Sequence, residues 1–192
     1  MPHTETVTAS LGTILAENTA VIDRLATDAA STALDDVADR LRAAERIFVL
    51  GAGRSGLALR MTAMRLMHLG LDVHVVGEVT TPAITAADAL LVASGSGSTA
   101  GIVRAAETAH AVGATVLALT TAGSSPLAGL ATVTVVVPAA EKQDHGSALS
   151  AQYSGGLFEQ SVLLIGDAVF HTLWQASGST AADLWPRHAN LD

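Results

Sequence analysis

The sequence predicts an α/β fold: a doubly wound sheet of five parallel strands with helices on both faces. From residue 46 onward, short apolar runs rich in β-branched residues alternate with helical stretches, and several of these runs end in glycine. Alternating strands and helices indicate βα units, and strands that are apolar on both faces are typical of a parallel sheet covered on each side. We therefore expect three layers, with helical extensions at the N- and C-terminal ends.

The N-terminal segment, residues 1–45, predicts two amphipathic helices. Apolar residues recur at helical spacing between residues 10 and 45, with acids and arginines between them. Ser31 precedes the second stretch of this pattern, and it is the expected N-cap of the second helix.

The middle segment, residues 46–137, predicts the sheet itself. The expected strands are Ile47–Leu50, Val73–Val76, Ala89–Ala93, Thr115–Leu119 and Val133–Val137. Helices are expected between the strands at 55–69, from the second of two glycine-rich loops to about residue 112, and at Ser125–Leu130. Gly70 and Gly113 follow the first two of these helices, where glycine is a common C-terminal stop.

The last segment, residues 138–192, predicts a loop, two helices and a tail. Residues 138–155 are polar and contain glycine, a long apolar helix is expected at 156–176, and a short one at 180–185. Asp167 is expected to be a buried polar group of the long helix. Because a chain of 192 residues favours one domain, we treat residues 1–192 as a single unit.

Composition narrows the possible functions. The chain has no cysteine, which excludes a disulfide scaffold, a thiolate metal site and a cysteine nucleophile. Ten Lys and Arg stand against 18 Asp and Glu, for a formal charge of −8, so nucleic acid is not an expected partner. No apolar run approaches the roughly 20 residues of a membrane-spanning helix. The first ten residues lack the layout of a signal peptide, and we expect a cytoplasmic protein that contacts no membrane.

A first glycine-rich loop, Gly-Ala-Gly-Arg-Ser-Gly at residues 51–56, follows the first strand and opens a helix. Backbone amides and a helix N-terminus in this position can hold a phosphate, with Gly53, Arg54 and Ser55 as candidate binding residues. Two other interpretations stay open. Glu78 lies 22 residues after the loop, where a dinucleotide-binding fold keeps the acid that binds ribose. Alternatively, the glycines merely allow a strand and a helix to pack closely.

A second glycine-rich loop, Ser-Gly-Ser-Gly-Ser-Thr at residues 94–99, follows the third strand and opens another helix. Its candidate phosphate ligands are Ser94, Ser96, Ser98 and Thr99. In a doubly wound sheet with the flavodoxin-like order 2-1-3-4-5, both loops flank the crevice where strand order reverses. Two helix N-termini with several hydroxyls suit a compact phosphate monoester better than an extended dinucleotide. Simple N-capping would explain only Ser96 or Thr99.

Six motifs keep one order from about residue 46 to the end of the chain. They are GAGRSG, MRLMHLG at 64–70, VVGEVTTPAI at 75–84, SGSGST, LFEQ at 157–160 and RHANLD at 187–192. In this combination the chain resembles the 6-phospho-3-hexuloisomerase family of the sugar isomerase (SIS) domain superfamily. The resemblance implies a five-stranded parallel sheet flanked by helices. It also implies interconversion of 3-hexulose 6-phosphate and fructose 6-phosphate, the second step of formaldehyde fixation by the ribulose monophosphate route.

The chain departs from the family pattern at four positions. The family usually has glutamate at Ser98, proline at Tyr153, serine at Gly156 and glutamate at Asp192. Tyr153 and Gly156 lie immediately before the LFEQ motif, so these two changes fall beside the residue that the motif contributes.

The implied chemistry needs few groups. Moving a carbonyl from C3 to C2 requires a base for the C2 proton, an enediol intermediate and hydrogen bonds to the oxygen that gains charge. Glu159 of LFEQ, near the start of an apolar helix, is the candidate base. His188 of RHANLD is the second candidate catalytic residue, expected to polarise a carbonyl or to carry the hydroxyl proton. The histidines show no close ligand spacing, so no metal is expected, and no cofactor.

Glu78, Arg54 and His68 each keep two interpretations. Glu78 and Thr80 follow the second strand, beside the first loop, where Glu78 would bind sugar hydroxyls or tie the loop down. Arg54 would pair with the phosphate or bridge to a neighbouring subunit. His68 lies among methionines and leucines, which favours packing in the core or at an interface.

The function classes reduce to a phosphosugar isomerase and its alternatives. These are an isomerase for a different phosphosugar, a non-catalytic sugar-phosphate sensor, and a nucleotide-dependent enzyme that uses the first loop and Glu78. A homo-oligomer is expected, a dimer at least and a tetramer as in the family, because the helices at 10–45 and 156–176 carry more apolar surface than one domain buries. The tail after Pro186 is expected to dock on a neighbour, so that His188 completes an adjacent subunit's site.

Overall fold

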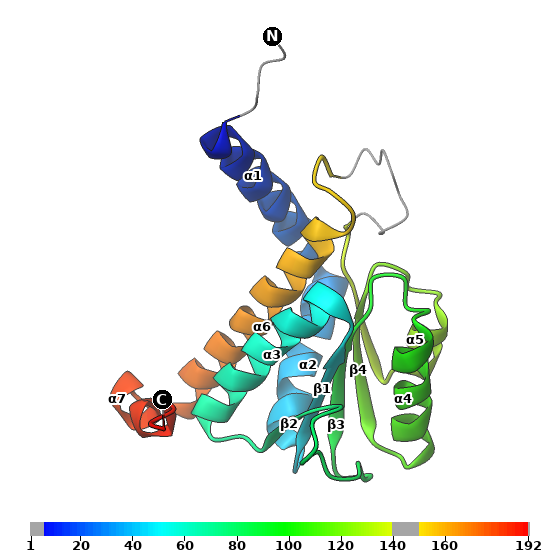
Figure 1. Ribbon diagram of the computed structural model, residues 1–192, viewed down its shortest axis with the longest axis vertical. Coiled ribbons are helices and arrows are strands. Elements are labelled where there is room, and N and C mark those ends of the chain that lie inside the picture. The colour runs from blue at the N-terminus through cyan, green and yellow to red at the C-terminus, as the bar shows by residue number, and fades with distance from the viewer. Residues whose placement is uncertain (1–5, 140–149, 192) are drawn as a thin grey trace.

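The computed structural model describes residues 6–139 and 150–191 (Figure 1). Its sheet has five parallel strands in the order β2-β1-β3-β4-β5, which confirms the expected topology. The strands are β1 (Ile47–Gly51), β2 (Val73–Val75), β3 (Ala89–Ala93), β4 (Thr115–Thr120) and β5 (Val133–Val136). Each lies within one residue of its predicted bounds, because apolar runs closed by glycine or polar residues are a local signal.

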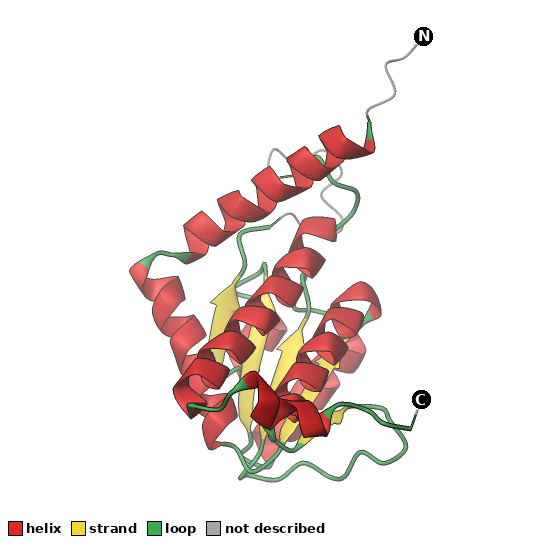
Figure 2. Cartoon of the chain, turned by 90° about the vertical axis from the view of Figure 1, so that its left-hand side faces the viewer, coloured by secondary structure: helices red, strands yellow, loops and turns green. Residues whose placement is uncertain are grey.

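Helices cover both faces of the sheet (Figure 2). On one face lie α2 (Asp28–Ala43), α3 (Gly53–Leu69) and α6 (Gly156–Ser177), and on the other lie α4 (Ala100–Ala111) and α5 (Pro126–Leu130). Successive residues of β3 enter opposite cores: Leu91 packs with α2, α3 and α6, whereas Leu90 and Val92 pack with α4 and α5. This two-sided burial explains why the strands are continuously apolar.

The N-terminal helices begin and end differently from the expectation. Helix α1 spans Val7–Leu25, and the N-cap of α2 is Thr27, not Ser31. Thr27 has an extended backbone, with φ −76° and ψ 151°, so the chain turns there and Ser31 falls inside the helix. Figure 1 shows α1 projecting from the body of the molecule.

Helix α6 packs along α3. Gly166 of α6 faces Thr62 of α3 so closely that a methyl group at Gly166 would overlap the Thr62 side chain. The buried stripe of α6 runs through Val162, Gly166 and Leu173. Asp167 lies off this stripe and is exposed, so the expectation of a buried Asp167 was wrong.

The C-terminal part continues from α6 into α7 (Ala181–Leu184) and a 3₁₀ turn at Trp185–Arg187. A capping box starts α7, because Thr180 Oγ1 accepts a hydrogen bond from the Asp183 amide and the Asp183 carboxylate accepts one from the Thr180 amide. Of the predicted loop at 138–155, residues 140–149 lie outside the described part of the chain, as does the departure at Asp192. None of the described helices combines the length and apolarity needed to cross a membrane.

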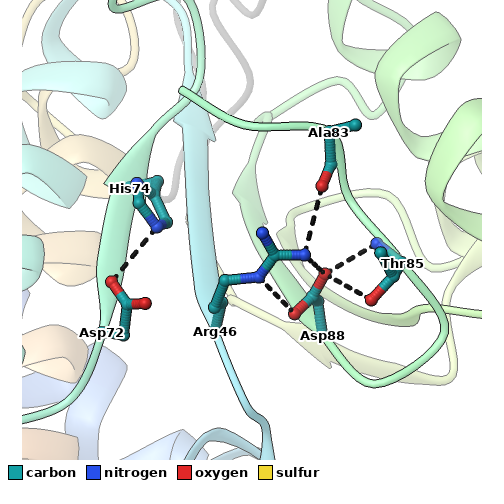
Figure 3. Close-up of polar contacts among 6 residues, drawn as sticks. All are labelled: Arg46, Asp72, His74, Ala83, Thr85 and Asp88. Atoms are coloured by element: carbon teal, nitrogen blue, oxygen red, sulfur yellow. Dashed lines mark hydrogen bonds and ion pairs between the residues drawn. The ribbon is translucent and has the colours of Figure 1, made fainter. Parts of the chain in front are cut away.

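A charged cluster holds the edge of the sheet where the strands begin (Figure 3). Arg46 donates from Nε and Nη2 to the two carboxylate oxygens of Asp88, at 3.0 and 2.7 Å. Asp88 Oδ2 also accepts from the backbone amide and the hydroxyl of Thr85, and Arg46 donates to the carbonyl of Ala83. The cluster fixes the loop between β2 and β3 at the amino edge, and the glycine-rich loops leave the sheet at the opposite, carboxyl edge.

Candidate active site

The glycines of the first glycine-rich loop meet two structural needs, close packing at Gly51 and Gly56 and a left-handed backbone at Gly53. A methyl group at Gly51 would lie 2.8 Å from the amide nitrogen of Gly56, and one at Gly56 would overlap the Gly51 carbonyl oxygen. Close packing of strand and helix therefore accounts for these two glycines. Gly53 differs, because its φ of +56° is a left-handed conformation that favours glycine.

An ion pair links this loop to the start of α6. Arg54 Nε lies 2.6 Å from Glu159 Oε2. The Glu159 side chain is 5% exposed and that of Arg54 is 68% exposed, so the carboxylate is buried and the guanidinium faces outward. The pair joins positions 105 residues apart and was not among the partners expected for Arg54. Ser55, the next residue of the loop, is buried.

The second glycine-rich loop gathers its hydroxyls. Ser94 Oγ and Thr99 Oγ1 lie 3.2 Å apart, and Ser96 Oγ accepts hydrogen bonds from the amide and the hydroxyl of Ser98 at 3.3 and 3.0 Å. Thr99 is the N-cap residue of α4, but its side chain makes no capping hydrogen bond. Capping therefore does not account for this hydroxyl.

Two threonines at the end of β4, Thr120 and Thr121, hold the second loop through hydrogen bonds, and sequence reasoning missed them. Thr120 Oγ1 and Thr121 Oγ1 donate to the carbonyl of Gly95 at 2.9 and 2.8 Å. Gly97 has a φ of +59°, and a methyl group there would overlap the Ser125 hydroxyl. The Thr-Thr pair at a strand end was the only available signal of this support.

The two loops and the start of α6 form one site. Gly51 pairs with Ala93 in the sheet, so the loops leave adjacent strands at the same level. The ring of Phe158 lies against Gly95, since a methyl group at Gly95 would be 3.5 Å from Phe158 Cδ1. Glu159, the next residue, reaches Arg54 in the first loop. The start of α6 thus lies against both candidate phosphate loops, with Glu159 paired to the first and Phe158 packed on the second. Each loop opens a helix, and helix N-termini favour anions.

Glu78 and Thr80 lie beside this site on the loop after β2. Glu78 Oε1 is 2.6 Å from Arg60 Nη2 on α3, and both side chains are about half exposed. The pair ties the loop after β2 to α3, and both interpretations of Glu78 stay predictions. Thr80 is exposed.

His188 lies far from Glu159 of the same chain. Its ring stacks on that of His68, with centroids 4.0 Å apart, and lies 4.7 Å from the Trp185 ring. His68 is in the last turn of α3 and Arg54 in the first, about 21 Å apart along the helix axis at 1.5 Å per residue. The two candidate catalytic residues therefore do not meet within one chain.

The tail docks on its own chain, which differs from the expectation that it needs a neighbour for order. Arg187 donates to the carbonyl of His68 at 3.3 Å and packs over Gly70. Burial lowers the pKa of His68, and the nearby charges of His188 and Arg65 lower it further. These effects favour the neutral form of His68, and the exposed ring of His188 stacks on this buried ring. Across residues 6–139 and 150–191, no three His, Cys, Asp or Glu side chains are grouped so as to hold a metal ion.

Comparison with known proteins matches residues 40–160 to the SIS domain. A 3-hexulose-6-phosphate isomerase from Mycobacterium gastri is 60% identical over 147 residues, which cover 77% of this chain and 74% of the relative. A 3-hexulose-6-phosphate isomerase from Bacillus subtilis is 38% identical over 159 residues, 82% of this chain and 86% of the relative. A crystal structure from Methanococcus jannaschii, from which a function of 3-hexulose-6-phosphate isomerase was inferred, has a TM-score of 0.83 at 28% identity and covers 95% of this chain and 99% of that chain.

These matches confirm the family that the six motifs indicated, and the observed strand order agrees with it. The chain belongs to the SIS domain family and, within it, to the group of 3-hexulose-6-phosphate isomerases.

Proposed function

We propose that the protein interconverts 3-hexulose 6-phosphate and fructose 6-phosphate, with Glu159 as the base. The observation that carries the proposal is the position of the Glu159 carboxylate, buried where both glycine-rich loops meet the start of α6. The named function of the relatives supports the same substrate.

The second loop is the main phosphate site in this proposal. Ser94, Ser96, Ser98 and Thr99 present clustered hydroxyls at the N-terminus of α4, and Ser55 lies at the N-terminus of α3. Helix N-termini carry unpaired amides and a partial positive charge, which suit a phosphate dianion. The overall acidity of the chain does not oppose this, because the binding field is local.

The reaction moves one carbon-bound proton. Glu159 removes the proton on C2, the electron pair forms the C2=C3 double bond, and O3 gains the negative charge. O3 is protonated and O2 loses its proton, after which Glu159 returns a proton to C3 and the carbonyl stands at C2. Arg54 orients the carboxylate through the 2.6 Å contact, and its exposed guanidinium is placed to donate to a substrate oxygen.

If His188 takes part in the reaction, it must do so in the site of another chain, because it lies far from Glu159 of its own chain. His188 is exposed at the far end of α3, so on this proposal it transfers the hydroxyl proton in the site of an adjacent subunit. The proposal therefore includes a homo-oligomer, a dimer at least and a tetramer as the full assembly. Exposed apolar side chains on α1, at Leu11, Leu15 and Ile22, support such an assembly.

The proposal also places the protein in the cytoplasm, at the second step of formaldehyde fixation by the ribulose monophosphate route. A phosphorylated sugar is charged and stays within the compartment that makes it, so its isomerase works there too.

Proton exchange tests the function and the base together. Incubated with fructose 6-phosphate in deuterated water, the wild-type protein should introduce deuterium at the reacting carbons and form the 3-hexulose. Glu159→Gln keeps the shape and removes the base, so activity should fall by about a hundredfold or more. Phosphate affinity should be nearly unchanged.

The outcomes separate the alternatives. Binding without exchange in the wild-type protein would indicate a sugar-phosphate sensor, and exchange only with another sugar phosphate would indicate a different isomerase. Neither binding nor exchange would favour a nucleotide-dependent enzyme. More than about a tenth of wild-type activity in Glu159→Gln would overturn the assignment of the base.

A further inference from the structure

We propose that Glu17, on α1, is a positioning residue for the reaction, because it clamps the turn that leads into α6 and Glu159. The inference rests on the proposed function and deepens it. Sequence reasoning assigned nothing to Glu17, which belongs to a helix outside the sheet core. Figure 1 shows α1 passing beside the yellow segment that enters α6.

Three donors from one turn converge on the Glu17 carboxylate. The backbone amide of Ala151 donates to Oε1 at 2.6 Å. The Ser150 hydroxyl and the Gln152 side-chain amide donate to Oε2 at 2.7 and 2.9 Å. One acid on α1 therefore holds a turn that is 133 to 135 residues away in the sequence.

A second set of contacts extends the clamp to the residue after the base. Gln160 Nε2 donates to Gln152 Oε1 at 2.7 Å, and Asn18 Nδ2 donates to Gln160 Oε1 at 2.7 Å. Since Asn18 adjoins Glu17, the chain of side chains starts and ends on α1. It passes through Gln160, whose neighbour Glu159 is held from the other side by Arg54.

The charge of Glu17 suits this role. Partial burial raises the pKa of Glu17, but the hydrogen bonds from Ala151, Ser150 and Gln152 outweigh that effect, and the pKa lies below its usual value. A carboxylate accepts all three hydrogen bonds with its two oxygens. In a glutamine side chain one of these oxygens is replaced by an NH2 group, which would face the donor groups of the turn. Glu17→Gln therefore breaks the clamp with little change of size.

The position of Glu159 matters because proton abstraction needs the base within hydrogen-bond reach of the C2 proton. A displacement of about 1 Å can cost a hundredfold in rate. Within the described residues, the Glu17 carboxylate bonds to residues 150–152, which are separate from the two glycine-rich loops, so we expect phosphate binding to be independent of the clamp. The inference therefore predicts a loss in kcat without a matching change in phosphate affinity.

The experiment compares Glu17→Gln with wild type by two measurements. Hydrogen–deuterium exchange of the backbone amides should become faster at residues 150–160, whether or not the protein is active. In the isomerase assay, well below the unfolding temperature, kcat should fall by about 10- to 100-fold. The inhibition constant of inorganic phosphate should stay unchanged.

Three companion variants make the test specific. Asp23→Asn makes the same chemical change at an exposed position of α1 and should alter neither measurement. Glu17→Asp keeps the charge and should recover part of kcat. Gln152→Leu removes the bonds of the Gln152 side chain to Glu17 and to Gln160 but keeps those of Ala151 and Ser150 to Glu17. It should therefore show an intermediate loss of kcat even if Glu17→Gln folds poorly.

Each contrary outcome has one meaning. Unchanged amide exchange at residues 150–160 in Glu17→Gln would overturn the clamp itself. Faster exchange with wild-type kcat would overturn the positioning role and leave the turn merely structural. A wild-type protein that shows clamp-dependent amide exchange but isomerises no sugar phosphate would overturn the proposed function, and the positioning role with it.

Discussion

At the scale of single residues, the candidate site contains a buried carboxylate that pairs with an arginine. A buried charge is costly unless it is paired, and Arg54 supplies the partner for Glu159 at 2.6 Å. Both residues were expected to be functional from the glycine-rich loop and the LFEQ motif. Their pairing was not, because nothing local relates positions 105 residues apart.

The proposed phosphate contacts of the second glycine-rich loop can be tested at Ser96. Ser96→Ala should raise KM for fructose 6-phosphate by about tenfold or more, because a hydrogen bond to a charged oxygen contributes roughly 1.5–3 kcal/mol. Steady-state kinetics should show kcat close to wild type. Ser10→Ala, the same change on α1, serves as the control. An unchanged KM in Ser96→Ala would move the phosphate away from the second loop.

At the scale of elements, the two edges of the sheet carry different groups of residues. The carboxyl edge carries glycine-rich loops with hydroxyls, whereas the amino edge is fastened by the Arg46–Asp88 pair and Thr85. Burial raises the pKa of Asp88, but hydrogen bonds from Arg46 and Thr85 outweigh it and hold that pKa below its usual value. The folded state therefore prefers the ionised form of Asp88.

This preference gives a pH dependence with a definite sign. A carboxyl whose pKa is lower in the folded state stabilises the protein above its unfolded pKa of about 4, and this contribution is lost as pH falls below that value. Asp88→Asn should cost about 1–3 kcal/mol of unfolding free energy at pH 7, because a buried donor loses its acceptor. Its stability should also vary less between pH 5 and the acid range.

Denaturant unfolding at several pH values measures both effects. Asp35→Asn, at an exposed position of α2, is the matched control and should leave the unfolding curve near wild type. Equal acid sensitivity in Asp88→Asn and wild type would show that Asp88 does not carry the effect.

At the scale of the whole molecule, one chain keeps its two candidate catalytic residues apart and leaves apolar surface exposed. His188 and Glu159 lie at opposite ends of α3 and α6. An apolar groove of about 280 Å³ opens between α1, α2 and α6, lined by residues that include Ile22, Leu34 and Leu164. Ile22 and Leu164, which line this groove, are 52% and 42% exposed in one chain. Exposed apolar patches of this kind are typical of surfaces that bind another protein.

Mixing inactive variants tests whether subunits share sites. Glu159→Gln and His188→Ala proteins should each be nearly inactive alone. After subunits exchange, hybrids regain sites with both native residues. For dimers mixed in equal amounts, half are hybrids with one intact site of two, so activity should reach about a quarter of wild type.

The control is a mixture of His188→Ala with His188→Asn, which can form no intact site. Hybrids demonstrated by mass spectrometry that stay inactive would contradict a shared site.

The positions of the strands, the helix stops and the glycine-rich loops were all determined by the sequence itself. Apolar runs, glycines and hydroxyl clusters act over a few residues, and so Ala89–Ala93 and the loop at 94–99 could be located directly. Local patterns also misled: Ser31 looked like an N-cap, and Asp167 seemed surrounded by apolar neighbours. In the fold, the chain turns earlier, at Thr27, and Asp167 lies off the buried stripe of α6.

Only the tertiary structure decided which side chains meet. The Arg54–Glu159 pair, the Glu17 clamp on residues 150–152, and the separation of His188 from Glu159 all depend on how α1, α3 and α6 pack against one another. In the Arg54–Glu159 pair and in the Glu17 clamp, the partners lie more than a hundred residues apart in the sequence. A helical pattern states which face of a helix is apolar, but the position of a side chain relative to a distant one follows from the packing of whole helices. The residue types of the candidate site could therefore be predicted from the sequence, whereas their positions relative to one another follow from the packing of the helices.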